Sequence, residues 1–99
     1  MRVITVTPAQ LEQTAARIDS ETDNYRRLYT QLFDAVDTMK AGWSGKDNEA
    51  FTNRIHTFES DFHQISVLCT QYAEFLRNSA GAYRRTQETI TSQANQLKG

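Results

Sequence analysis

Apolar side chains recur along the first half of the chain at alternating steps of four and three residues. This spacing keeps them on one side of an α-helix that packs at a small left-handed crossing angle, as in coiled coils and four-helix bundles. No charged residue interrupts the series, which predicts one long helix over about 7–40. The positions are Leu11, Ala15, Ile18, Thr22, Tyr25, Tyr29, Leu32, Val36, Met39 and Trp43.

The start of this helix is marked by several local signals. Thr7 is a good N-cap, Pro8 suits the first helical position, and Gln10 completes a capping box. Val6 before the cap and Leu11 after it are spaced to form a hydrophobic staple. The signals agree on a helix that begins at about residue 7.

The helical pattern stops where two glycines, Gly42 and Gly45, occur within four residues. Glycines at this spacing end a helix and permit a tight reversal, so we expect a turn over 41–46. Ser44 can cap a second helix that begins at about residue 47.

A second series with the same spacing follows the turn and predicts a helix to about residue 88. Its positions are Phe51, Ile55, Phe58, Phe62, Ile65, Cys69, Tyr72, Leu76, Ser79, Tyr83, Thr86 and Ile90. The apolar character weakens after Leu76, and the last residues are largely polar. We therefore expect the tail, about 89–99, to be flexible.

The apolar stripe is widest in the middle of both helices, wider than one partner helix can cover. Burying about ten large side chains against a second hairpin gives roughly 15–30 kcal/mol gross, against an association cost of ~4–15 kcal/mol. A monomer with an exposed apolar flank is the less favoured alternative. The predicted core and dimer interface comprises Tyr25, Leu28, Tyr29, Leu32, Phe33, Val36, Phe58, Phe62, Ile65, Leu68, Cys69, Tyr72, Phe75 and Leu76. The predicted fold is all-α: one domain over 1–99, an antiparallel helical hairpin that dimerises into a four-helix bundle.

Composition narrows the class of partner. Eleven basic and twelve acidic side chains leave a net charge of −1, which gives no reason to expect nucleic acid as a partner. No run approaches the ~20 apolar residues of a membrane span, and no cleavable signal peptide is visible at the N-terminus. These features alone favour a cytosolic protein. The single cysteine, Cys69, is either a small core residue or one half of an intermolecular bridge.

Nothing in the sequence predicts a catalytic centre, a cofactor or a metal site. His56 and His63 are seven residues apart, roughly 10 Å along a helix, which is too far for one metal ion. Glu49, Glu59 and Asp61 are expected on an exposed charged face, because no nucleophile or cleft accompanies them. A glycine-rich phosphate loop is absent from the sequence.

The tripeptide Trp43-Ser44-Gly45 lies at mid-chain between two long helices in a chain of 99 residues. It occurs together with Val-Thr-Pro before the first helix, an Ala-Phe pair (50–51) and Tyr83. The whole chain thereby resembles the WXG family, the ESAT-6-like proteins exported by type VII (ESX-type) secretion systems. The resemblance implies a bacterial protein made in the cytoplasm, secreted without a cleavable signal peptide, and without catalytic activity. It implies a homodimer, or a heterodimer with a paralogous WXG protein, recognised by the type VII secretion ATPase.

The resemblance also implies an export signal in two parts. One part is the turn with Trp43 and Gly45, and the other is a Tyr-x-x-x-Asp/Glu motif near the end of the second helix, here at Tyr83. The sequence departs from this motif, since Gln87 occupies the acidic position and Glu88 follows it. Three explanations stay open: Gln87 is tolerated, a partner supplies the acidic motif, or the chain is exported passively within a pair.

Two further alternatives stay open from the residues. Trp43 either closes the end of the hairpin or contributes to a recognised groove, and the two roles are compatible. The protein either acts by binding as a secreted type VII substrate or serves as an intracellular structural adaptor in a larger coiled-coil assembly. A membrane-perturbing role is disfavoured, because the polar faces lack the cationic bias of interfacial helices.

Overall fold

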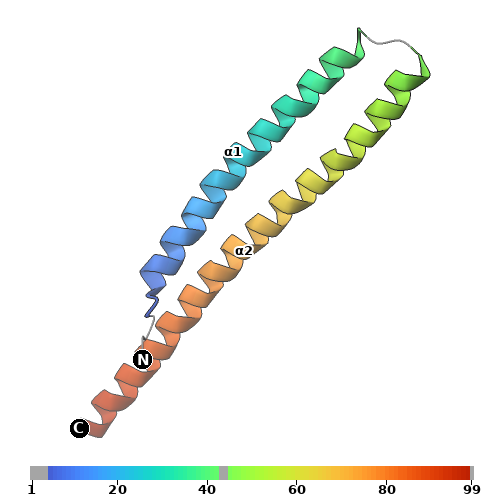
Figure 1. The fold of residues 1–99 in the computed structure, drawn as a ribbon. Helices are drawn as coiled ribbons and strands as arrows, with labels where there is room; N and C mark the ends of the chain where they lie inside the picture. The colour runs from blue at the N-terminus through green and yellow to red at the C-terminus, as the bar shows by residue number, and fades with distance from the viewer. Residues whose placement is uncertain (1–4, 43–44, 99) are drawn as a thin grey trace.

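The chain forms two long antiparallel helices that lie side by side (Figure 1). A computed structural model describes residues 5–42 and 45–98, with helix α1 over Pro8–Lys40 and helix α2 over Lys46–Lys98. The molecule is a rod of 82 × 27 × 16 Å. The fold is an all-α helical hairpin, as the sequence predicts.

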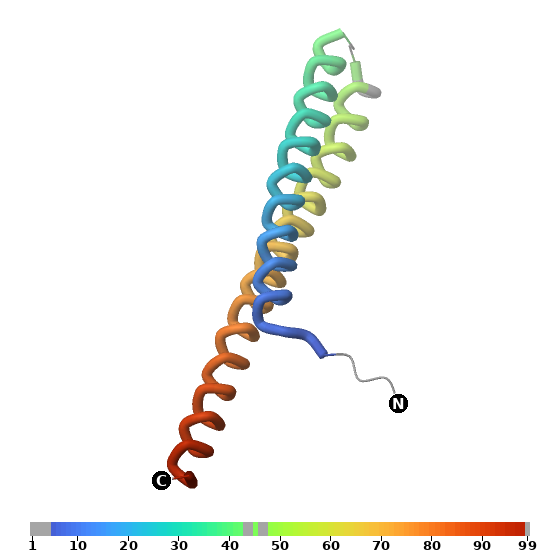
Figure 2. The backbone as a smooth tube through the Cα atoms, turned by 90° about the vertical axis from the view of Figure 1, so that its left-hand side faces the viewer, coloured from blue at the N-terminus to red at the C-terminus, as the bar shows by residue number. Residues whose placement is uncertain are grey.

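Helix α1 begins with a complete capping box. The Thr7 hydroxyl accepts a hydrogen bond from the Gln10 backbone N–H at 3.1 Å, and the Gln10 side-chain oxygen accepts one from the Thr7 N–H at 2.9 Å. These bonds satisfy N–H groups that have no partner within the helix. Figure 2 shows the chain turning sharply away from α2 just before α1 begins.

The end of α1 is tied to the start of α2. The Gly42 N–H donates to the Met39 carbonyl at 3.1 Å, and the Asn48 side-chain amide donates to the Lys40 carbonyl at 3.1 Å. Gly45 has a φ of 98°, in the left-handed region that glycine adopts without steric cost. Ser44, the expected cap of the second helix, lies outside the described residues, so its role stays a prediction.

Helix α2 continues to Lys98, whereas the sequence pattern predicted a helix end near residue 88. Neither glycine nor proline occurs between Gly81 and the final residue, and most residues of this stretch are compatible with a helix. The fading of apolar side chains removes packing partners without breaking the backbone pattern. The last residues of α2 therefore project as a helix beyond the start of α1 (Figure 1).

The side chains that the contact between the two helices buries completely are small. Ala15, Ala73 and Ala80 are completely buried, and Ala15 and Ala73 form one cluster with Leu76. The largest fully buried side chain is that of Ser66, whose hydroxyl donates to the His63 carbonyl within the same helix. Among the described residues, Phe33 and Leu76 are the large apolar side chains that one hairpin buries almost completely.

Aromatic rings fill the contact nearer the turn. Tyr29 stacks on Phe62 with ring centroids 6.2 Å apart, and Phe33 meets the same ring edge-on at 5.9 Å. Tyr25 packs edge-on against Tyr29 at 5.4 Å. This aromatic cluster holds the middle of α1 against α2.

Candidate functional site

The side chains of the predicted apolar series of α2 point in two directions: some face α1, and the others face away from it. Ile55, Phe62, Cys69 and Leu76 are half-buried or buried toward α1. The intervening positions point away from the contact, and the exposed fraction of their side chains is 40–55%. These intervening positions are Phe51, Phe58, Ile65 and Tyr72. The division arises because α1 is too narrow to cover both columns of a stripe with this spacing.

The exposed columns form one apolar surface, which we call the outer stripe. Its most exposed members are Leu28, Leu68 and Phe75, at 65%, 63% and 62%. The outer stripe consists of Leu28, Leu32 and Met39 on α1 and Phe58, Ile65, Leu68, Tyr72 and Phe75 on α2. A surface of this kind on a soluble helix marks an interaction site.

Two grooves between the helices show that both halves of the outer stripe lie on one face. Leu32 of α1 and Phe58 of α2 line the first, an entirely apolar groove of about 250 Å³. Tyr25 of α1 and Ile65 of α2 line the second, of about 340 Å³, together with Cys69. The stripe therefore spans the α1–α2 contact along the half of the rod nearer the turn.

The second groove contains a polar group without a partner. The Tyr25 hydroxyl is buried and has no hydrogen-bond partner among the described residues. Burial raises the pKa of the Tyr25 phenol above its ordinary value, and the neighbouring Tyr29 and Cys69 raise the pKa further. The phenol is consequently neutral across the physiological range.

The other edge of the helix contact is polar. Glu12 pairs with Arg84, Asp19 pairs with Arg77, and the Arg26 guanidinium donates to the Thr70 hydroxyl at 3.1 Å. We call these three links the polar ladder. Successive links are seven residues apart, rising along α1 and falling along α2, so they share one edge and one register. The hairpin therefore has one polar edge and one apolar face.

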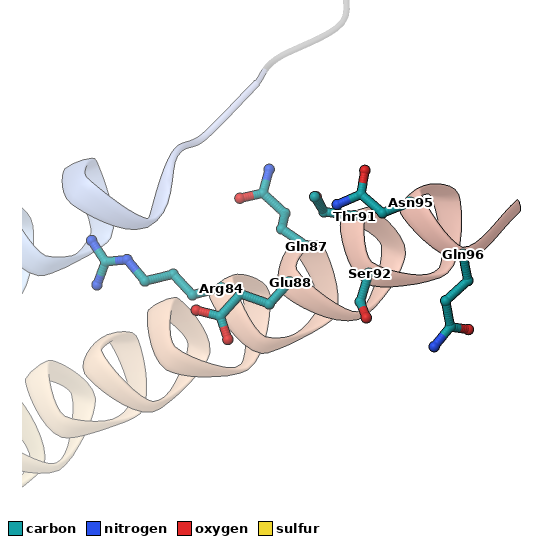
Figure 3. Close-up of a pocket in the computed structure, with 7 residues that line it drawn as sticks. All are labelled: Arg84, Gln87, Glu88, Thr91, Ser92, Asn95 and Gln96. Atoms are coloured by element: carbon teal, nitrogen blue, oxygen red, sulfur yellow. The ribbon is translucent and has the colours of Figure 1, made fainter. Parts of the chain in front are cut away.

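The candidate residues of the C-terminal export motif lie on the far half of α2. Tyr83 is 40% exposed, and Gln87 and Glu88 are exposed. Gln87 and Glu88 line a polar groove of about 640 Å³ on the part of α2 near and beyond the start of α1. The other lining residues are Arg84, Thr91, Ser92, Asn95 and Gln96. Figure 3 shows Gln87, Thr91 and Asn95 on one side of the helix and Ser92 and Gln96 on the other.

The two candidate parts of the export signal lie at opposite ends of the hairpin. Gly45 is at the turn, while Tyr83 lies 37 residues after the start of α2, or about 55 Å at ~1.5 Å per residue. Trp43 lies outside the described residues, so its place in the signal stays a prediction. Within one chain these parts are not brought together.

Sequence reasoning did not find the polar ladder, the Tyr25 hydroxyl or the polar groove. The seven-residue spacing of Glu12, Asp19 and Arg26 was a signal for the ladder. The buried hydroxyl depends on side-chain packing, for which the sequence has no pattern.

The described residues contain no group of three or more histidine, cysteine or acidic side chains that could hold a metal ion. His56 instead bridges the helices as a polar surface residue, with its Nδ1 atom 2.9 Å from Glu59 and its Nε2 atom 3.9 Å from Asp37. In the same residues, neither helix has an apolar stretch sufficient to cross a bilayer.

Comparison with known proteins points to one family. The family model described as "proteins of 100 residues with WXG" matches residues 3–88. The protein YukE of Bacillus subtilis (strain 168) is 26% identical over 97 residues, which cover 98% of this chain and 97% of YukE.

Solved structures agree on the fold. EsxA of Geobacillus thermodenitrificans superposes with a TM-score of 0.76 at 28% identity, over 91% of this chain and 99% of EsxA. The secreted protein EsxB of Bacillus anthracis has the same TM-score at 18% identity, over 88% of this chain and 99% of EsxB, a likeness of fold alone.

Proposed function

The chain belongs to the WXG100 family, and on that premise we propose that it is a non-enzymatic substrate of a type VII secretion system, exported as a folded dimer. It acts by binding other proteins, and its first partner is another helical hairpin. The observation that carries the proposal is the separation of the two candidate signal parts at opposite ends of one hairpin.

The separation supports export as a dimer. A receptor that reads the Trp43 turn and the Tyr83 region together would have to span about 55 Å on one chain. A second hairpin packed antiparallel brings its own Tyr83 region to the first chain's turn. The secretion ATPase is the proposed reader of this composite surface.

The outer stripe supports the same conclusion by a separate route. It leaves eight large apolar side chains exposed on one face, while the side chains that the hairpin buries completely are those of alanine and serine. A second hairpin on the outer stripe buries these side chains, each worth ~1.5–3 kcal/mol when fully buried. The polar ladder stays on the opposite edge and remains in contact with water.

Export of a Trp43→Ala variant tests the proposed signal. We expect the variant to stay in the cells while its purified form melts and sediments like the unmodified protein. Unimpaired appearance in the medium would exclude Trp43 from the signal. A protein that is never found in the medium, with or without the substitution, would favour the intracellular adaptor instead.

A further inference from the structure

A side chain of α2 reaches back across the turn and bonds to the end of α1. The Asn48 amide nitrogen donates a hydrogen bond to the Lys40 carbonyl at 3.1 Å, and Asn48 is the third residue of α2. The stretch of chain between the two bonded residues, 41–47, includes Trp43 and Gly45. The two helix ends that carry the turn are therefore tied directly to each other.

The end of α1 needs this bond because it lacks the commonest local cap. The last carbonyls of a helix have no partner within the helix, and a left-handed glycine just past the end often provides one. Ala41, at the C-cap, keeps right-handed helical angles, with φ −61° and ψ −24°. Gly45, the described residue with a positive φ, lies five residues after Lys40, too far along the chain to act as that cap. The Lys40 carbonyl is satisfied from the other helix instead.

Thr52 holds the Asn48 side chain in this orientation. Its hydroxyl donates to the Asn48 side-chain oxygen at 3.1 Å, and Thr52 is only 4% exposed. Other threonines of the two helices donate instead to the main-chain carbonyl four residues earlier, which is a frequent bond for a helical threonine. These threonines are Thr22, Thr38, Thr57, Thr70, Thr86 and Thr89. The Thr52 hydroxyl departs from this pattern to fix a neighbouring amide.

The two bonds together determine which way the amide faces. A main-chain carbonyl can only accept, so Asn48 turns its nitrogen toward Lys40 and its oxygen toward the Thr52 hydroxyl. We call these two bonds the turn clamp. The links of the polar ladder join one side chain to another, whereas the turn clamp ends on the main chain of α1. Fewer rotatable bonds therefore separate the two helices at the turn clamp.

We propose that Asn48, held by Thr52, is a positioning residue of the export signal: the turn clamp keeps the two helix ends at the separation in which the Trp43 turn is recognised. The inference rests on the proposed function. A receptor that binds a loop between independent helix ends must order that loop, which costs conformational entropy. The turn clamp removes part of this cost before the receptor binds.

Asn48→Asp tests the turn clamp with little change in shape. A carboxylate cannot donate to the Lys40 carbonyl, but it still accepts from Thr52, and its charge is favourable in the first turn of a helix. We expect the thermal midpoint to stay close to that of the unmodified protein. The Gly42 amide is expected to exchange its hydrogen about fivefold faster, as measured by NMR, because one hydrogen bond that closes the turn is lost. The fraction of the protein found in the medium is expected to fall.

The matched control is Asn53→Asp, the same substitution at an exposed position five residues later on α2. It is expected to leave both the Gly42 exchange rate and the exported fraction unchanged. An equal fall in export for this control would assign the effect to the added charge and overturn the inference.

A second pair of variants tests Thr52. Thr52→Val keeps the shape of the side chain but removes the hydroxyl, so we expect faster Gly42 exchange and lower export without a lower thermal midpoint. Thr52→Ser keeps the hydroxyl and is expected to be exported better than Thr52→Val. A purely structural role would make export follow the thermal midpoint in both variants, and that result would overturn the inference.

The remaining outcomes separate this inference from the proposed function. Unchanged Gly42 exchange in Asn48→Asp would show that the bond to Lys40 does not hold the turn. Faster exchange with unimpaired export would remove Asn48 from the signal, while retention of Trp43→Ala in the cells would still support the proposed function. Unimpaired export of Trp43→Ala would overturn the proposed signal itself.

Discussion

At the scale of single residues, the Tyr25 hydroxyl is the most constrained group in the hairpin. It is buried between the helices with no hydrogen-bond partner among the described residues, and burial raises the pKa of the phenol. A buried hydroxyl without a partner costs free energy that a phenylalanine ring of the same shape avoids. Tyr25 therefore packs as a ring and gains nothing from its oxygen.

The raised pKa makes stability depend on alkaline pH. In the unfolded chain the Tyr25 phenol ionises near its ordinary value of about 10. In the folded chain it keeps its proton to higher pH, so above about pH 10 the unfolded state binds fewer protons and the folded state loses stability as pH rises. We expect Tyr25→Phe to lose less stability than the unmodified protein over this range, as measured by thermal melts followed by circular dichroism. Tyr83→Phe, the same substitution at an exposed tyrosine, is the control.

Gln87 is the residue at which the chain departs from the motif of its family. It lines the polar groove and has the shape of glutamate without its charge. We expect Gln87→Glu to be exported at least as well as the unmodified protein, because it completes the Tyr-x-x-x-acid pattern with Tyr83. Quantitative immunoblotting of medium and cells measures the change, and export abolished by this substitution would contradict a role for an acidic side chain there.

At the scale of the elements, the start of α1 depends on local chemistry. The Thr7 hydroxyl accepts a hydrogen bond from the Gln10 backbone N–H. Thr7→Ala is expected to destabilise the protein by about 1 kcal/mol, whereas Thr7→Ser keeps the acceptor and most of the stability. Urea unfolding followed by circular dichroism measures both, and equal losses for the two variants would contradict the capping role.

The elements also show which features a sequence can predict. The capping box at Thr7 is readable because all its atoms come from four consecutive residues. The sequence pattern does not predict the extension of α2 to Lys98, because a solvated helix and a flexible tail are both polar. The sequence also does not predict which half of the α2 apolar series faces α1 and which half is exposed. The spacing of the series is compatible with either half facing α1. That choice depends on Ala15, Ala73 and Ala80, which bring the helices together at one edge.

At the scale of the whole molecule, the contact within one hairpin buries few large side chains completely. Its fully buried side chains are small, and eight large apolar side chains are exposed on the outer stripe. Folding and association are therefore expected to be linked.

Linked folding and association predict a stability that depends on concentration. Each tenfold dilution is expected to lower the free energy of unfolding of the dimer by about 1.4 kcal/mol, with a falling thermal midpoint. Leu68→Asp, which places a charge in the middle of the outer stripe, is expected to abolish the dimer and most of the helical signal at micromolar concentration. A Leu68→Asp variant that stays helical as a monomer would contradict the linkage. A thermal midpoint that does not change on dilution would contradict it as well.

The 55 Å between the turn and Tyr83 has a consequence for quality control in the cell. A newly synthesised chain presents only one part of the proposed export signal at each end. A receptor can contact both parts together only after a second folded chain has packed alongside the first. Dimer formation would then act as a quality-control step. Unpaired or misfolded hairpins lack the complete export signal and stay in the cell, and the secretion system selects folded dimers without a separate chaperone.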